Sequence, residues 1–288
     1  MKRLPQLALA SLTLLLASCN RVSPPAAPSG TTAYGLTTSG MLATFGTDNA
    51  AASYRTLSIS GLASGDTLVS LDYRNTDGRL YAATSNGRLY RIDPQTGVAT
   101  QDSAAVGQGV VTVDFNPSAN RLRVIGTNNM NYRLTLGAAP VPSASPAGTV
   151  TPDGIFAYAA GDVNAGKTPE LVAAAYTNSF NDSATGSVPA GSTTALYSFD
   201  AAQDVLVMHD VGPQFSTLKT VAPLGVNVMA GMVGFDISGM STAYASVSSG
   251  GKTTLYRVNL AASSQALSAV STLNDVSLRD LALVPASR

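Results

Sequence analysis

The chain has 288 residues, with 17 basic and 17 acidic side chains, one histidine, one cysteine and no tryptophan. The balanced charge and the absence of any basic cluster argue against nucleic acid as a partner, and a single cysteine excludes an internal disulfide. Small and β-branched residues are abundant beyond residue 32, and they suit short strands and tight turns better than helices.

Residues 1–18 have the features of a bacterial lipoprotein signal peptide. Lys2 and Arg3 precede an apolar run at residues 7–16, which is too short to span a bilayer and is typical of an export signal. The sequence Leu16-Ala17-Ser18-Cys19 resembles a lipobox, in which the cysteine is acylated and becomes the first mature residue. An ordinary signal peptide with an incidental cysteine is the alternative. We predict export, with membrane lipid held through acylated, for example palmitoylated, Cys19.

Residues 19–32 are predicted to form a lipidated, flexible tether. The stretch is rich in proline, serine and threonine, and such a composition buries too little apolar surface to offset the entropy of ordering. Asn20 stands directly after the cysteine, where aspartate would favour retention at the inner membrane. We therefore expect a lipoprotein of the cell envelope, at the outer membrane rather than the inner one.

A short strand that carries a tyrosine recurs in the rest of the chain. The copies lie at residues 89–93, 131–135, 196–200 and 255–259. Polar and apolar side chains alternate in each copy, which is typical of a strand with one buried face, because successive side chains point to opposite faces. The first copy continues into Pro94-Gln95-Thr96-Gly97, a turn sequence, and then into another strand. This order predicts a β-hairpin.

A second recurring unit is an apolar strand that precedes another strand by a short turn. Its copies at residues 69–73, 111–115 and 233–237 place Asp72, Asp114 and Asp236 at the same position. Two interpretations are open. The structural one, which we favour, is a carboxylate that accepts backbone N–H groups where the blade turns. The functional one is a ring of carboxylates that lines a central channel.

The two units together make four strands in about 40 residues, which is the blade length of a β-propeller. We predict an all-β, propeller-like domain at residues 33–288 with about five four-stranded blades. The second to fifth blades are expected at residues 66–105, 108–152, 153–212 and 230–274. Residues 33–60 would supply three outer strands and residues 278–284 an inner strand, so that the two ends of the domain share the first blade. Closing the ring in this way removes exposed strand edges.

Several motifs of the domain together carry a family resemblance. They are Gly35-Leu36-Thr37, Asp114-Phe115-Asn116-Pro117, Arg121-Leu122-Arg123-Val124, Ala157-Tyr158-Ala159, Gly161-Asp162-Val163-Asn164-Ala165-Gly166 and Ala173-Ala174-Ala175-Tyr176-Thr177-Asn178. In order and spacing they resemble the bacterial family called domain of unknown function 4394, over nearly all of residues 33–285. The resemblance implies a propeller-like exported protein. It implies no established activity and supplies no catalytic residues.

The sequence offers few groups for catalysis. A single histidine, His209, excludes any arrangement that needs two imidazoles, and we expect it to face solvent at the end of a strand at residues 205–208. No serine lies in a Gly-x-Ser-x-Gly elbow, and no glycine-rich phosphate loop is present. Enzymatic activity is therefore disfavoured, although carboxylates brought together by folding would escape a motif search.

One cluster has the spacing of a cation site. Asp162-x-Asn164-x-Gly166, with Glu170 four residues on, supplies alternating oxygen ligands and a glycine that permits a sharp turn, as in a calcium loop. The ligand and glycine positions of an EF-hand are not met. We favour the alternative, in which Asp162 and Asn164 cap their own backbone, and keep calcium as a cofactor hypothesis at Asp162, Asn164 and Glu170.

Two classes of function remain. We predict a binding or scaffolding module of the envelope, with an envelope protein or polysaccharide as partner, because loops on rigid scaffolds commonly carry recognition. The alternative is an enzyme that acts on an envelope or extracellular polymer through channel-lining carboxylates. Strongly raised carboxylate pKa values in an acidic pocket would favour the enzyme.

Overall fold

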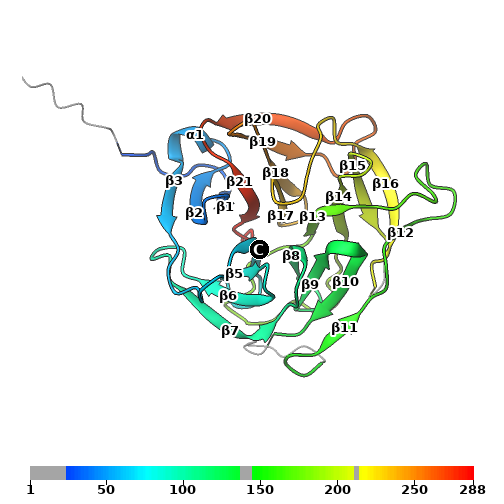
Figure 1. The fold of residues 1–288 in the computed structure, drawn as a ribbon, viewed down its shortest axis with the longest axis horizontal. Helices are drawn as coiled ribbons and strands as arrows, with labels where there is room; N and C mark the ends of the chain where they lie inside the picture. The colour runs from blue at the N-terminus through cyan, green and yellow to red at the C-terminus, as the bar shows by residue number, and fades with distance from the viewer. Residues whose placement is uncertain (1–23, 137–144, 211–213) are drawn as a thin grey trace, which may run out of the picture.

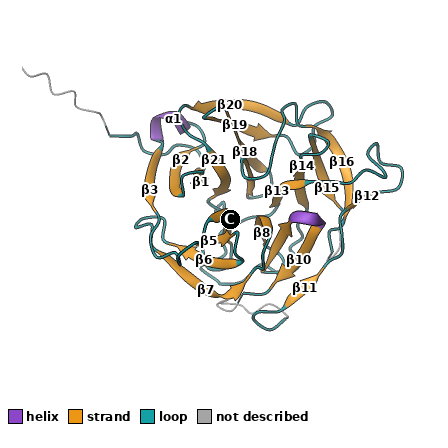
Figure 2. Ribbon diagram, viewed as in Figure 1, coloured by secondary structure: helices purple, strands orange, loops and turns teal. Residues whose placement is uncertain are grey.

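The computed structural model describes residues 24–136, 145–210 and 214–288. Within these residues, five antiparallel sheets surround a central axis as the blades of a propeller (Figure 1). The helical segments of this part are the short helix α1 (Ala50–Ser53) and the 3-10 turn η1 (Thr127–Asn129), both purple in Figure 2. None of its helices is long and apolar enough to cross a bilayer. The predicted all-β propeller with five four-stranded blades is confirmed.

The strands of each blade are ordered from the axis outward. Blade 1 contains β21 (Leu278–Leu283), β1 (Thr32–Thr37), β2 (Met41–Gly46) and β3 (Arg55–Ser58), and blade 2 contains β4 (Leu68–Arg74), β5 (Arg79–Thr84), β6 (Arg88–Ile92) and β7 (Ala99–Ala105). Blade 3 contains β8 (Val110–Asn116), β9 (Arg121–Gly126), β10 (Met130–Leu134) and β11 (Val150–Pro152). Blade 4 contains β13 (Leu171–Tyr176), β14 (Leu196–Asp200), β15 (Val205–His209) and β16 (Thr217–Pro223), with β12 (Ala157–Tyr158) parallel at its outer edge. Blade 5 contains β17 (Val233–Ser238), β18 (Thr242–Ser249), β19 (Lys252–Val258) and β20 (Leu267–Leu273).

Blade 4 departs from the predicted pattern. The sequence placed its end at residue 212, but its outer strand β16 runs to Pro223. The repeated tyrosine strand is the third strand in blades 2, 3 and 5, whereas in blade 4 it is the second strand, β14. The physical reason is the long connection at residues 177–195, after which β14 pairs directly with the inner strand β13. The remaining strands of the blade are therefore displaced along the chain.

Blade 1 joins the two ends of the domain. β1 pairs antiparallel with β21, so that Ala33 lies opposite Leu283 and Gly35 opposite Leu281. The side chains of Leu278, Leu281 and Leu283 are at most 1% exposed. The predicted closure of the ring by its terminal strands is confirmed.

The apolar core lies between neighbouring blades. Phe199 of blade 4 stacks on Phe235 of blade 5 with ring centroids 4.5 Å apart, and Tyr81 of blade 2 contacts the ring edge of Phe115 in blade 3 at 5.2 Å. Blades 5 and 1 approach so closely that a Cβ on Gly234 would lie 2.2 Å from the backbone nitrogen of Leu281. Glycine at this position therefore allows the inner strands to pack.

The chain ends over the centre of the ring (Figure 1). After β21, the tail crosses the ends of the inner strands, where Ala286 donates its N–H to the carbonyl of Ser179 at 3.2 Å. The guanidinium of Arg288 forms an ion pair with Asp182 at 2.5 Å and lies 4.7 Å from the centre of the Phe180 ring. We call this side of the ring the end face, and the side where the inner strands begin the start face.

Candidate functional site

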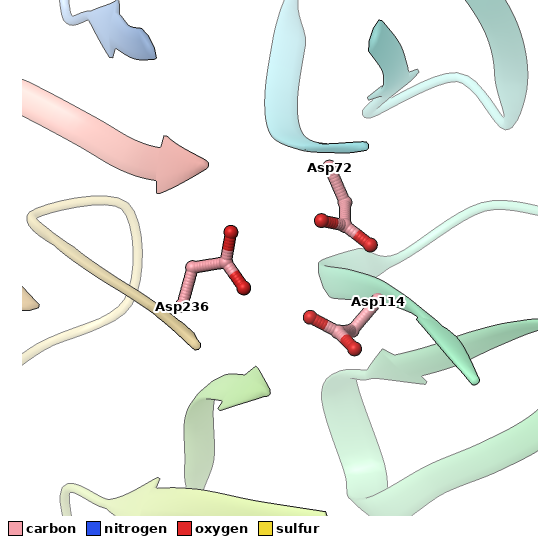
Figure 3. A group of neighbouring side chains, drawn as sticks. All are labelled: Asp72, Asp114 and Asp236. Atoms are coloured by element: carbon pink, nitrogen blue, oxygen red, sulfur yellow. The ribbon is translucent and has the colours of Figure 1, made fainter. Parts of the chain in front are cut away.

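Buried aspartates from four inner strands meet near the axis. Asp72 on β4, Asp114 on β8, Asp236 on β17 and Asp280 on β21 are 4–6% exposed. Figure 3 shows the carboxylates of Asp72, Asp114 and Asp236 pointing toward one another, and one oxygen of each lies within 4.8 Å of the other two. The recurring position predicted for these three residues therefore brings their side chains together.

Each carboxylate accepts a backbone N–H group from the next inner strand around the ring. The pairs are Phe115 to Asp72 at 2.6 Å, Tyr176 to Asp114 at 3.0 Å, Leu283 to Asp236 at 2.5 Å and Leu71 to Asp280 at 2.9 Å. Hydrogen bonds to a charged or strongly polar acceptor are among the stronger ones in proteins. The aspartates accept backbone N–H groups, as the structural interpretation of the sequence predicts, but the donors lie on the neighbouring inner strand and not where the blade turns. The aspartates thus tie blade to blade.

Asp280 is the member that the sequence motif did not reveal. It also accepts the hydroxyl of Ser70, at 2.6 Å. In β8 the residue that follows the aspartate donates its N–H to the preceding inner strand, and in β21 this donor is Leu283. The position equivalent to the recurring aspartate is therefore Ala282, and Asp280 lies two residues before it. Asp280 follows Arg279 and therefore lacks the two apolar neighbours that mark Asp72, Asp114 and Asp236 in the sequence.

Burial raises the pKa of all four carboxyl groups, and their mutual repulsion adds to the effect for most of them. The pKa of Asp236 and that of Asp280 reach about 7, with loss of hydration as the largest cause in both. Burial first, and then the charge of a neighbouring aspartate, raises the pKa of Asp72 and Asp114 well above the ordinary value. The backbone N–H donors oppose this shift. The group can therefore hold protons near neutrality, and Asp72, Asp114 and Asp236 are the residues whose spacing would also suit a hard cation.

The predicted calcium loop forms a capped turn. Asp162 accepts the N–H of Asn164 at 2.8 Å, and its second oxygen accepts the N–H of Thr220 at 2.7 Å. The ammonium of Lys167 donates to the side-chain oxygen of Asn164 at 2.8 Å. Glu170 instead lines a cleft between blades 3 and 4. The contact of Asp162 with the backbone of Asn164 is that of the turn-cap alternative, whereas the Asn164 side chain binds the side chains of Thr220 and Lys167. Calcium at Asp162, Asn164 and Glu170 stays a prediction.

His209 does not face solvent, so the expected exposure was wrong. It is 1% exposed, because the last residue of β15 points between the strands of blade 4 and the ring of Phe156, whose centroid lies 5.4 Å away. Its two ring nitrogens lie 2.8 Å from the hydroxyl of Ser198 and 2.6 Å from the carbonyl of Phe215. Burial lowers the pKa of His209 to about 3, so the ring is neutral at physiological pH.

A cleft of about 530 Å³ opens on the start face between blades 3 and 4. Its walls are mostly apolar. They are formed by the beginnings of two inner strands, the η1 turn and the segments that lead into blades 4 and 5. The lining residues are Val111, Ile125, Gly126, Thr127, Asn128, Asn129, Ile155, Thr168, Pro169, Glu170, Leu171, Val172 and Ala230. Ile155 is 72% exposed. Because the lining comes from distant segments, no contiguous motif could have revealed it.

The η1 turn at the edge of the cleft has an unusual backbone. Asn128 and Asn129 are consecutive residues in the left-handed region, with φ of 56° and 62°. The side-chain amide of Asn129 donates to the carbonyl of Phe156 at 3.1 Å and holds the turn against the chain that leads into blade 4. Asparagine tolerates this conformation better than most residues, and such strain gathers at functional sites.

A second groove, of about 640 Å³, lies on blade 2. Its two arginines are Arg79 and Arg91, and its carboxylate is Asp93. Arg91 also lies 3.7 Å from Asp102, so that the positive charges have acidic neighbours. All of the groove's lining residues belong to a single blade, whereas the cleft on the start face draws on three.

Cys19, the predicted lipidation site, lies outside the described residues. The described part of the predicted tether, residues 24–31, runs along blade 1 beside α1. Ala26 donates its N–H to the carbonyl of Ala52 at 2.9 Å, and Ser29 donates to the side-chain oxygen of Asn49, also at 2.9 Å. This segment enters β1 at the end face, because Ala33 pairs with Leu283, the last residue of the inner strand β21.

Comparisons with known proteins relate the chain to a family and list similar solved structures. No curated protein matches it. Among solved structures, a chain of a nidogen/laminin complex shares 10% identity at a TM-score of 0.47, over 90% of this chain and 100% of that one. The Swd1 β-propeller domain of Myceliophteria thermophila shares 13% identity at a TM-score of 0.38, over 77% of this chain and 60% of that one. The model of the family described as "Domain of unknown function (DUF4394)" matches residues 41–282, and the chain therefore belongs to that family.

Proposed function

We propose that the chain is an exported lipoprotein of the cell envelope, anchored through acylated Cys19, whose propeller is a binding or scaffolding module. The partner would be held in the cleft between blades 3 and 4. The observation that carries the proposal is this cleft, whose volume of about 530 Å³ falls in the range of ligand sites, roughly 300–1,000 Å³. Mostly apolar walls with a few polar groups are typical of such sites.

The wall residues support recognition rather than simple packing. Ile155 is 72% exposed at the cleft, although burial of a branched aliphatic side chain is favourable. The hydroxyl of Thr127 and the amides of Asn128 and Asn129 offer hydrogen-bond donors and acceptors beside it. The left-handed backbone at Asn128 and Asn129 presents these groups in a fixed arrangement.

The position of the anchor relative to the cleft also supports the proposal. The segment that leads from Cys19 is fastened to blade 1 beside α1 and enters the ring at the end face. In Figure 2, α1 and the η1 turn at the cleft lie on different sides of the ring axis. A chain anchored through this segment would therefore keep the cleft away from the membrane, where a partner can reach it.

The aspartate group gives less support to the enzyme alternative. Its raised pKa values are those of a candidate acid, but each carboxylate is at most 6% exposed and is bonded to the backbone of the next blade. Hydrogen bonds of this kind position a blade. The same contacts would have to be broken for a polymer to reach the carboxyl groups.

A pull-down from envelope extracts tests the proposal. The full chain carrying Ile155→Asp is compared with the parent and with Val270→Asp, a matched control on β20 of blade 5, where the side chain is 46% exposed. We expect partners captured by the parent and by the Val270→Asp control to be lost with Ile155→Asp. Equal capture by all three proteins would refute the cleft as the binding site.

A further inference from the structure

We propose that the cleft between blades 3 and 4 binds an extended peptide segment that is apolar and carries a positive charge, and that Glu170 recognises this charge. The inference rests on the proposed function and names the chemistry of the partner. It is argued from the charge, the shape and the polar groups of the lining residues.

Glu170 is the single ionisable residue among those that line the cleft. Its backbone is fixed, because its N–H donates to a carboxylate oxygen of Asp200 at 2.9 Å and its carbonyl accepts the N–H of Ala201 at 2.8 Å. Within the described residues, the side-chain carboxylate itself forms no hydrogen bond or ion pair. The nearby ammonium of Lys167 donates instead to Asn164 and to Gln203, at 2.8 Å each.

A free carboxylate in a mostly apolar cleft selects for a cation. Charges that face each other across an interface determine specificity and suppress wrong partners, since a like charge there is repelled. The attraction strengthens when a bound peptide displaces water from the apolar walls, because the local dielectric constant then falls. The cleft therefore favours a lysine or arginine side chain next to Glu170 and disfavours an acidic one.

The remaining lining fits a peptide. Half-buried Val111 and exposed Ile155 offer branched aliphatic surface, which matches apolar side chains rather than the polar faces of sugars. The amides of Asn128 and Asn129 can pair with the peptide groups of an extended chain. In such a chain alternate side chains point the same way, so that apolar residues can contact the walls while basic ones approach Glu170.

The probe is an eight-residue fluorescent peptide of alternating leucine and lysine, compared with one of alternating leucine and glutamate. The full chain is reconstituted in nanodiscs of zwitterionic lipid, empty nanodiscs provide the background, and binding is followed by fluorescence anisotropy. We expect the parent to bind the lysine peptide at least about tenfold more tightly than the glutamate peptide. We expect Glu170→Gln to weaken lysine-peptide binding about tenfold and to remove the preference.

Two further variants separate the ligand class from the site. Ile155→Asn, which removes the apolar contact without adding charge, should weaken binding of both peptides, whereas Val270→Asn, on blade 5, should leave both affinities unchanged. Glu170 is exposed, so its replacement by glutamine should leave the melting temperature unchanged. A loss of peptide affinity at an unchanged melting temperature is then caused by the lost charge. The proposal is overturned if the parent shows no preference, if it binds neither peptide, or if Glu170→Gln keeps the preference. If the pull-down still depends on Ile155 in those cases, the binding module stands and only its ligand class is refuted.

Discussion

Removal of the last inner strand tests the closure of the ring. A chain that ends at residue 274 lacks β21 and therefore loses Leu278, Leu281 and Leu283, which are at most 1% exposed. Full burial of a leucine side chain contributes about 1.5 to 3 kcal/mol, so these three contribute roughly 4.5 to 9 kcal/mol. The free energy of unfolding of a typical domain is roughly 5 to 15 kcal/mol. We therefore expect the shortened chain to be insoluble or partly unfolded.

The assay is limited proteolysis with cleavage sites mapped by mass spectrometry, together with size exclusion and thermal melting by circular dichroism. Because β1 pairs with β21, new cleavage should appear between Thr32 and Ser58, where the strands of blade 1 lose their inner partner. A chain that ends at Val284 is the control, since it keeps β21 and loses only the tail with Arg288. The reasoning is refuted if the chain that ends at residue 274 stays monomeric, melts like the parent and resists cleavage in blade 1.

Three other predictions concern the aspartates, the capped turn and the anchor. The pKa of Asp280 is about 7 in the folded chain and about 3.8 as the unperturbed value, so the folded state binds more protons between these pH values and the free energy of unfolding should fall as pH rises from 4 to 7. His209 has its pKa lowered to about 3 and therefore changes the free energy of unfolding in the opposite direction below pH 6.5. The check is therefore urea unfolding of Asp280→Asn and of the parent, and the difference between their free energies of unfolding should change between pH 4 and 7. A difference that stays constant across this range would contradict the prediction. Chelation should leave the melting temperature unchanged, because Asp162 and Asn164 are engaged in the turn. A drop that excess calcium reverses in the parent, and that is absent from Asp162→Asn, would establish a calcium site there instead. Cys19→Ala should abolish labelling by a fatty-acid analogue and release the chain from the membrane fraction, and label retained on the variant would disprove acylation at Cys19.

The repeat could be predicted from the sequence because the inner strand of each blade packs against its neighbours in the same way. The recurring position holds Asp72, Asp114 and Asp236. Each of them accepts an N–H group from the neighbouring inner strand, and the three carboxylates also meet at the axis. Ring closure could be predicted as well, because residues 278–284 looked like an inner strand without a hairpin and residues 33–60 like outer strands without an inner one.

What depends on contacts between distant segments could not be predicted in the same way. The cleft is lined by residues from Val111 to Ala230, and the burial of His209 depends on Phe156, which lies far from it in the chain. The shift of blade 4 also escaped prediction, because the tyrosine strand at Leu196–Asp200 keeps its local pattern in whichever position of the sheet it stands. Local alternation specifies a strand but not its neighbours.

Photo-crosslinking at Ile155 tests the central claim, that the cleft between blades 3 and 4 holds a partner, most directly. A photoreactive amino acid is placed at position 155, and in a separate variant at position 270 on blade 5, and both are irradiated in intact envelopes. The account predicts a discrete cross-linked partner from position 155 that is absent from position 270. The same adduct from both positions, or an adduct from position 270 alone, would contradict it.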